Sequence, residues 1–413
     1  MAAPKEKTRK GNPADQPVMD LGAILTNDYE MAVDGNLKDW GDVSMISFQT
    51  LMSGEYECDW TGPKDLSGKV GAQYGASKIY FSIQINDNAV VQKLRQWKSD
   101  RVELWLAPES ADGKPLGAPR GLLLDIGPMV DGGKATVKWI SGKQGGAEAV
   151  GFVGNEGYDF EVGVEYSALS KVSPVMNGAM RYCVLVRDWD QDDQYEDEAS
   201  IGTCPIDPKK SSSIKPEKMG RIPLNLYDSM WSTLMSDSSL ASASGGWVHQ
   251  LVNLGGSDLP EIVAAAGNKL VVAGFGLENA GLSYYMVELT SQDSDITPTL
   301  TVKDINGDKI PEIVLTRQEQ CTNGNMTATR DYVFQLGAHN IDLKTNYVTE
   351  FHDNSNTSER VVNQYKLSKA GIVQTIGKGS STALQNCELN GDENMIPILL
   401  PSSGKKTEKH SYL

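Results

Sequence analysis

The sequence predicts an all-β protein in which a jelly-roll-like β-sandwich precedes a domain of propeller-like repeats. Three features favour this fold class. Short segments of alternating apolar and polar residues recur through the first half, 41 glycines allow frequent turns, and one strand motif returns in the second half. A chain of 413 residues has room for two to three domains with cores of their own.

Six segments of the first half are strand candidates, and the first two alternate between apolar and polar residues as half-buried strands do, whereas helical periodicity is rare there. Residues 90–97 and 167–172 could each form a turn or two of helix. The expected strands are Lys78–Ile85, Arg101–Leu106, Gly121–Asp125, Ala135–Ile140, Tyr158–Val164 and Met180–Val186.

Composition divides the chain into four parts. Residues 1–18 have no periodicity and are expected to be a flexible arm, and residues 19–226 form the predicted sandwich. Residues 227–246 are a linker or a short helix, and residues 247–413 form the repeat domain. Inside the sandwich part, the Lys-, Ser- and Pro-rich stretch 208–223 is typical of a linker.

The chain is acidic, with 38 Lys and Arg against 54 Asp and Glu and a net charge of −16. This charge disfavours nucleic acid and anionic membranes as partners, and no apolar stretch approaches the ~18 residues of a membrane span. The N-terminus has charges but no apolar core, so it is not an intact signal peptide. A cytoplasmic protein and an exported one whose leader is absent from this chain both remain open; we favour export to the periplasm, cell surface or extracellular space.

Five cysteines are present, without the C-x-x-C spacing of zinc or redox sites. Cys183 and Cys204 flank an acidic stretch and could form a disulfide, as could Cys321 and Cys387. Five buried free thiols are the alternative.

The sharpest motif of the second half is an acidic loop with oxygen-bearing side chains at positions 1, 3, 5 and 9. Calcium prefers six to eight oxygen ligands, and a tight loop with alternate inward side chains can supply them. A turn without metal is the alternative, because Asn-Gly pairs are common in turns. The predicted ligands are Asp304, Asn306, Asp308, the carbonyl of Ile310, and Glu312.

The strand that follows this loop repeats an earlier one. Leu259–Val263 recurs as Ile310–Val314, and Glu261 and Glu312 are 312 − 261 = 51 residues apart. Such a loop before a buried strand resembles the FG-GAP/VCBS repeat of extracellular propellers, in which the loop binds calcium. About three such repeats fit after residue 247, so this domain is either an incomplete propeller or a compact sandwich.

The first half resembles another family in four segments that occur in the family's order. These segments resemble the motifs of the family 9 carbohydrate-binding module and its DOMON-like relatives, which implies a β-sandwich and, in some members, sugar or haem binding. The segments are Val33–Trp40, Lys78–Asp87, Ser99–Leu106 and Tyr158–Leu169.

Sugar binding needs apolar ring faces with polar groups beside them. The candidate ligand-binding residues are Trp97, Trp105, Asp87, Asp100 and Glu103, although Trp105 could instead pack in the core and the acids could form salt bridges. A second, weaker calcium site is Asp188, Asp190 and Asp192 in a D-x-D-x-D pattern, for which a solvated loop is the alternative.

The sequence contains none of the common catalytic signatures, so we expect no enzyme. We expect a calcium-stabilised adhesion protein that binds a glycan outside the cytosol. A structural subunit of an extracellular protein assembly, as a homo- or hetero-oligomer, is the alternative. A haem-binding electron-transfer protein is an outsider, because all four histidines lie outside the first domain.

Overall fold

The computed structural model divides into two compact units, Met1–Ser229 and Met230–Leu413. Their boundary lies inside the segment predicted as a linker or short helix, and each unit is described by itself. The structure describes residues 16–26, 28, 31–41, 43–52, 60, 62–91, 99–125, 136–141, 145–191, 196–241, 243, 246–255, 259–278, 281–289, 297–322, 326–353, 360–368, 371–375, 389 and 407–410.

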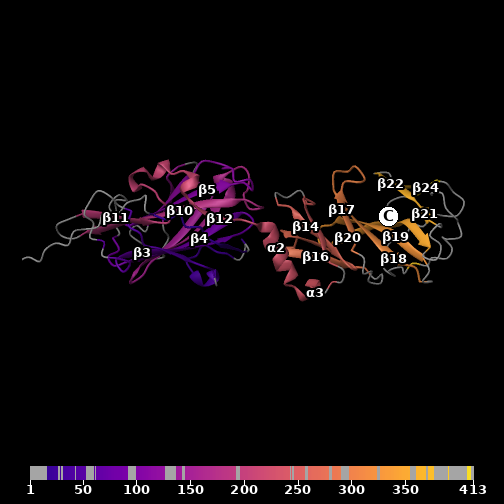
Figure 1. The fold of residues 1–413 in the computed structure, drawn as a ribbon, viewed down its shortest axis with the longest axis horizontal. Helices are drawn as coiled ribbons and strands as arrows, with labels where there is room; N and C mark the ends of the chain where they lie inside the picture. Colours follow the sequence, from indigo (N-terminus) through magenta and orange to yellow (C-terminus); the bar gives the residue numbers. More distant parts are fainter. Residues whose placement is uncertain are drawn as a thin grey trace, which may run out of the picture. The chain divides into compact units, whose positions relative to one another are not determined.

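The N-terminal unit is a sandwich of two six-stranded sheets, as the predicted fold class requires (Figure 1). The first sheet has β1 (Ala23–Leu25), β2 (Ile46–Phe48), β3 (Leu66–Tyr74), β4 (Lys78–Asp87), β9 (Gly157–Glu165) and β8 (Ala147–Val153). The second sheet has β11 (Glu196–Gly202), β10 (Ala179–Gln191), β12 (Gly220–Pro223), β5 (Arg101–Glu109), β6 (Arg120–Asp125) and β7 (Thr136–Trp139).

Alternation along the strands builds the core between the two sheets. Phe81 of β4 and Tyr182 of β10 approach each other across it, with ring centroids 6.2 Å apart. Ile83 and Ile85 follow on the same face of β4, and Val184 on that of β10. All six strands expected in the first half are present, and the helical turn α1 (Tyr166–Leu169) overlaps the expected segment 167–172. Most of the other expected helical segment, 90–97, lies outside the described residues.

The Lys-, Ser- and Pro-rich stretch is part of the sandwich and not a linker. It forms the 3₁₀ turns η4 (Pro208–Ser213) and η5 (Pro216–Lys218) and then β12, which pairs with β10. Its apolar residues Ile214 and Met219 pack on the outer face of the second sheet, against Trp105 and the Cys183–Cys204 disulfide. Spaced apolar residues among many polar ones therefore anchor the stretch despite its linker-like composition.

A buried glutamate holds the N-terminal loop of the sandwich. Glu161 of β9 is 1% exposed and accepts backbone N–H bonds from Asp34 (3.0 Å) and Gly35 (2.6 Å). The indole N–H of Trp40 also donates to it, over 2.9 Å. Two of the family-like segments noted in the sequence therefore meet at one carboxylate.

The C-terminal unit consists of antiparallel sheets in which consecutive strands are neighbours. The third sheet has β13 (Val248–Val252), β14 (Glu261–Ala266), β15 (Lys269–Phe275) and β16 (Leu282–Glu288). The fourth has β17 (Thr299–Lys303), β18 (Glu312–Gln320), β19 (Met326–Leu336), β20 (Ile341–Asp353) and β21 (Arg360–Val362). The fifth has β22 (Gln364–Ser368), β23 (Gly371–Thr375) and β24 (Thr407–His410).

The sequence repeat is visible in the third and fourth sheets. Each begins its second strand with a buried glutamate that accepts the backbone N–H seven residues earlier. Leu254 donates to Glu261 over 2.7 Å, and Ile305 donates to Glu312 over 2.9 Å. The 51-residue interval inferred from the sequence therefore relates two structurally equivalent units.

The repeated sheets stack front to back. Val263 of β14 shares one apolar cluster with Ile313 of β18, although the residue equivalent to Ile313 is Ile262, on the other face of β14. The opposite face of the fourth sheet packs on the fifth, where Tyr347 stacks on Tyr365 with ring centroids 3.9 Å apart. Propeller blades stack in this way, but the described sheets do not form a closed propeller.

Two helices lie on the other face of the third sheet. They are α2 (Leu226–Met235) and α3 (Ser238–Ala241). Trp231 of α2 stacks on His249 of β13 at 4.2 Å between ring centroids. The hydroxyl of Tyr284 in β16 donates to Asp237, between the helices, over 2.6 Å. The segment predicted as a linker or short helix therefore covers the end of the stack.

Candidate metal centre at one end of the sandwich

Three aspartates extend the apolar core of the sandwich at one end. Asp87 comes two residues after Ile85 on β4, and Asp188 comes two residues after Val186 on β10. Asp100 comes two residues before Val102 of β5. Because side chains two apart on a strand point to the same face, all three carboxylates continue core-facing rows.

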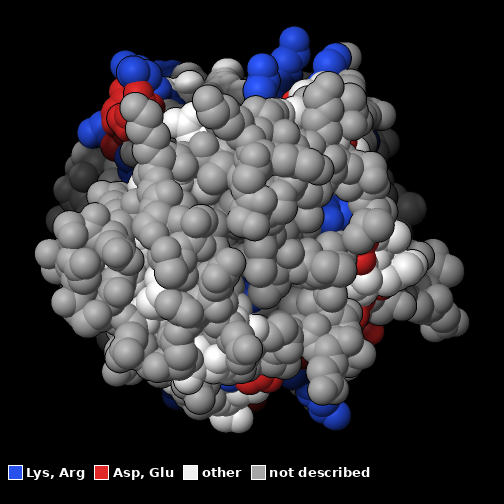
Figure 2. All heavy atoms as spheres, turned by 90° about the vertical axis from the view of Figure 1, so that its right-hand side faces the viewer, with Lys and Arg blue, Asp and Glu red and all other residues white. Residues whose placement is uncertain are grey.

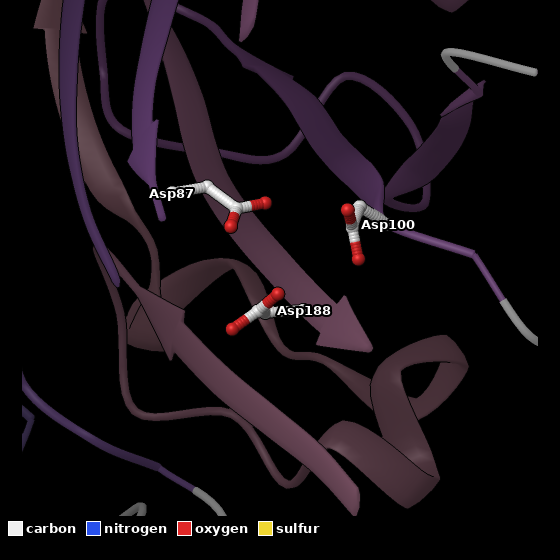
Figure 3. Close-up of side chains that lie close together, drawn as sticks. All are labelled: Asp87, Asp100 and Asp188. Carbon is white, nitrogen blue, oxygen red and sulfur yellow. The ribbon is translucent and has the colours of Figure 1, made fainter. Parts of the chain in front are cut away.

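The three carboxylates face one another across the two sheets, as Figure 3 shows. One oxygen atom from each lies within 4.8 Å of the others, and the side chains are 2% or less exposed. In the described part of the chain, this is the one group of three acidic, His or Cys side chains close enough to share a metal ion.

Backbone N–H groups fix two of the three carboxylates. Asp100 accepts from Val91 over 2.5 Å and from Trp189 over 2.7 Å, so it joins the end of β10 to the residues after β4. Asp87 accepts from Ala89 over 2.7 Å through one oxygen. Its other oxygen is buried and has no hydrogen-bond partner among the described residues.

Burial and mutual repulsion change the acidity of the cluster. Burial, and then the charge of Asp87, raise the pKa of Asp100 to about 8. Burial also raises the pKa of Asp87. Tyr158 of β9 lies beside them: its hydroxyl is buried without a hydrogen-bond partner among the described residues, and burial and the three carboxylates raise its pKa.

This arrangement suits a divalent cation. Three adjacent buried carboxylates cannot all carry their charge without compensation, because burial penalises each charge and the charges repel. A cation would offset both effects and would take carboxylate oxygens as ligands, with the Tyr158 hydroxyl beside them. Calcium and magnesium are the ions that prefer such all-oxygen sites.

The cluster combines residues from two separate sequence predictions. Asp87 and Asp100 were predicted as ligand-binding residues, and Asp188 as one of three weak calcium ligands. Asp192 lies outside the described residues, and Asp190 is described only as part of β10. Tyr158 was missed, although its position two residues before Phe160 on a core-facing row is visible in the sequence.

The other predicted ligand-binding residues occupy different places. Trp105 is 1% exposed, and its indole N–H donates to Glu103 over 3.0 Å. Glu103 also pairs with Arg187 at 3.0 Å. Both side chains thus serve core packing in this structure, whereas stacking on a sugar would need the Trp105 ring exposed. Trp97 lies outside the described residues.

The acidic loop of the C-terminal unit satisfies its carboxylates internally. Asp304 accepts N–H bonds from Gly307 (2.6 Å) and Lys309 (2.9 Å). Asp308 accepts from the N–H of Ile310, whose side chain is 46% exposed, over 2.8 Å. Gly307 has a φ of +83°, which glycine adopts without strain.

The side-chain amide of Asn306 occupies the middle of this loop. It donates to Asp308 over 3.0 Å and also to Glu312. Burial, and then the charges of Asp308 and Asp304, raise the pKa of Glu312. The donor set of the predicted ligands suits calcium, but a calcium ion would need the Asn306 amide to turn its oxygen inward.

Comparison with known proteins gives matches to solved structures alone. No known protein family matches the chain, and no curated protein matches it. A family 9 carbohydrate-binding module from Caldicellulosiruptor kristjanssonii in complex with cellotriose is 12% identical, with a TM-score of 0.37 over 50% of this chain and 94% of that chain. The same module in complex with glucose is 12% identical, with a TM-score of 0.36 over 50% of this chain and 96% of that chain.

Proposed function

We propose that the chain is a non-catalytic glycan-binding protein whose β-sandwich is stabilised by calcium at Asp87, Asp100 and Asp188. The observation that carries the cation part is the meeting of three buried carboxylates at one end of the core. The three aspartates come from both sheets, so an ion held there would join the two sheets at this end of the sandwich.

Calcium is favoured over magnesium by the shape of the cluster. Magnesium demands near-ideal octahedral geometry and keeps several waters, whereas calcium accepts irregular sets of oxygen ligands. The carboxylates come from β4, from β10 and from the residue before β5, and they lie at the edge of the buried core. The acidic loop Asp304–Glu312 is a second and weaker calcium candidate, because its oxygens already accept N–H bonds from the loop.

Glycan binding is supported by the family-like segments of the sandwich. The segments from Val33, Lys78, Ser99 and Tyr158 onward lie in one unit, and two of them meet at Glu161. Figure 2 shows the described Lys, Arg, Asp and Glu side chains of one face in small groups, between atoms of residues that the structure does not describe.

An extracellular or periplasmic location is supported by the cysteines. Cys183 and Cys204 form a disulfide, and Cys321 is also disulfide-bonded. Disulfides persist in oxidising compartments, where calcium is abundant enough for modest oxygen sites. None of the helices in the described part of the chain has the length and apolar character that a membrane crossing requires.

A neutral-glycan array, read with and without calcium, tests the function. We expect binding to at least one glycan class and weaker binding after chelation. A structural subunit of a larger assembly is the second candidate, favoured by the stacked sheets of the C-terminal unit, since stacked repeats often present extended binding surfaces. A stoichiometric oligomer by light scattering, together with an empty array, would select that candidate.

A further inference from the structure

The outer face of the first sheet is covered over part of its area. The N-terminal segment lies on it, with Trp40 packed against Tyr80, and Val43 and Met45 near Gly71. The rows of side chains nearer to the metal centre lie beyond this contact.

One of these rows crosses five strands. Register places each side chain directly opposite the next, so all point to the same face. With a strand spacing of ~4.8 Å, the row is roughly 19 Å long. It consists of Ser47 (β2), Lys69 (β3), Gln84 (β4), Asp159 (β9) and Phe152 (β8).

The polar side chains of this row keep unused hydrogen-bonding capacity. Lys69 is exposed, and Gln84 and Asp159 are half-buried. Among the described residues, none of the three has a hydrogen-bonding or ion-pair partner, and burial alone raises the pKa of Asp159. The neighbouring pair Asn86 and Ser67, by contrast, is joined by a hydrogen bond of 3.4 Å.

An aromatic ring stands at the end of the row. Phe152 is 42% exposed, one of the largest apolar exposures in the described chain. Its ring lies against Gly35, where an added Cβ would come within 1.6 Å of it, so a side chain at this position would have to displace the ring. The ring thus packs on the backbone of Gly35 while part of its surface faces solvent.

We infer that this row is a binding surface for a neutral oligosaccharide that lies across the strands. A sugar ring offers an apolar C–H face to Phe152, and its hydroxyls can donate to Asp159 and Gln84 and accept from Lys69. The charges of Lys69 and Asp159 cancel, which favours an uncharged glycan over a polyanion. This inference rests on the proposed glycan-binding function and names the surface for it.

The test is titration of the whole calcium-loaded chain with cellotriose and with the hits of a neutral-glycan array. Phe152→Ala and Asp159→Ala should each weaken binding about tenfold or more. Val153→Ala is the matched control for the first, since Val153 is 38% exposed and adjacent on β8 but points to the other face. Asp112→Ala, in an exposed turn, is the control for the second.

The outcomes separate the surface from the function. If the native chain binds a glycan and the Phe152 and Asp159 variants bind it equally well, the row is not the site and the proposed function stands. If that binding instead disappears in Trp97→Ala, the predicted Trp97 site is the correct one. If the native chain binds no glycan, both the function and the row are overturned.

Discussion

The two acidic sites of the molecule handle their charge in opposite ways. In the sandwich, Asp87, Asp100 and Asp188 come from separate segments of the chain and face one another while buried. In the C-terminal unit, Asp304–Glu312 is one continuous loop whose carboxylates receive N–H bonds from the loop itself. The acidic loop, which is easy to recognise in the sequence, therefore needs a cation less than the three aspartates do, which the sequence does not show as a group.

The largest expected effect is the calcium dependence of the sandwich. Calcium at 100 times its dissociation constant should add about 2.7 kcal/mol to the free energy of unfolding. For a unit of roughly 200 residues, this raises the melting temperature by about 5–10 °C. Calorimetry of the whole chain in calcium and in chelator measures it.

The matched variants locate this effect. Asp100→Asn should remove the calcium response, whereas Asp112→Asn, in the exposed turn bonded to Lys114, should keep it. A full response in Asp100→Asn would show that the ion binds elsewhere.

A second effect is the pH dependence of the calcium-free protein. The pKa of Asp100 is about 8 in the folded chain, against about 3.9 when unfolded. Between pH ~4 and pH ~8 the folded state therefore binds one more proton than the unfolded state does. The stability that this proton provides is complete below pH ~4 and is lost as pH rises through ~8.

Unfolding in denaturant from pH 5 to pH 9, with chelator present, measures this loss. Asp100→Asn should flatten the profile, because the amide stays neutral throughout. Calcium should also flatten it in the native chain. A chelated native protein that gains stability over this range would contradict the raised pKa.

Glu161 provides a buried carboxylate that needs no cation. It accepts N–H bonds from Asp34, Gly35 and Trp40. Glu161→Gln weakens these bonds and should cost about 1–3 kcal/mol, equally with and without calcium. Denaturant unfolding with and without calcium tests this. A loss of stability that depends on calcium would mean that Glu161 is energetically coupled to the candidate metal centre.

These sites also show what the sequence could reveal. The local pattern of apolar and polar residues predicted the strands of the sandwich correctly, because the burial of alternate residues depends on the sequence of each strand itself. Composition failed at residues 208–223, where Ile214 and Met219 anchor a linker-like stretch on the outer face of the second sheet. The sequence indicated two possible disulfides, with five free thiols as the alternative, and the structure contains the one between Cys183 and Cys204.

The sequence indicated each of the three aspartates separately, two as ligand-binding residues and one as a calcium ligand, but did not predict that they form one cluster. Asp87, Asp100 and Asp188 each end a row of core-facing residues, a signal that is visible in the sequence. Their meeting depends on which strands pair and in what register, and that pairing is fixed only in three dimensions. Tyr158 was missed for the same reason.

The smallest effect is expected at the acidic loop. Asp308→Ala removes the acceptor of the Ile310 N–H and a partner of the Asn306 amide, which should cost about 1 kcal/mol without calcium. A modest site of the extracellular kind, with a dissociation constant of about 10⁻⁴–10⁻³ M, would enlarge this loss at ~10 mM calcium. Hydrogen exchange in β17 and β18 reports it separately from the sandwich. If the loss is the same without calcium and at ~10 mM calcium, the loop is a metal-free turn held by its own N–H groups. The three aspartates then remain the proposed cation site.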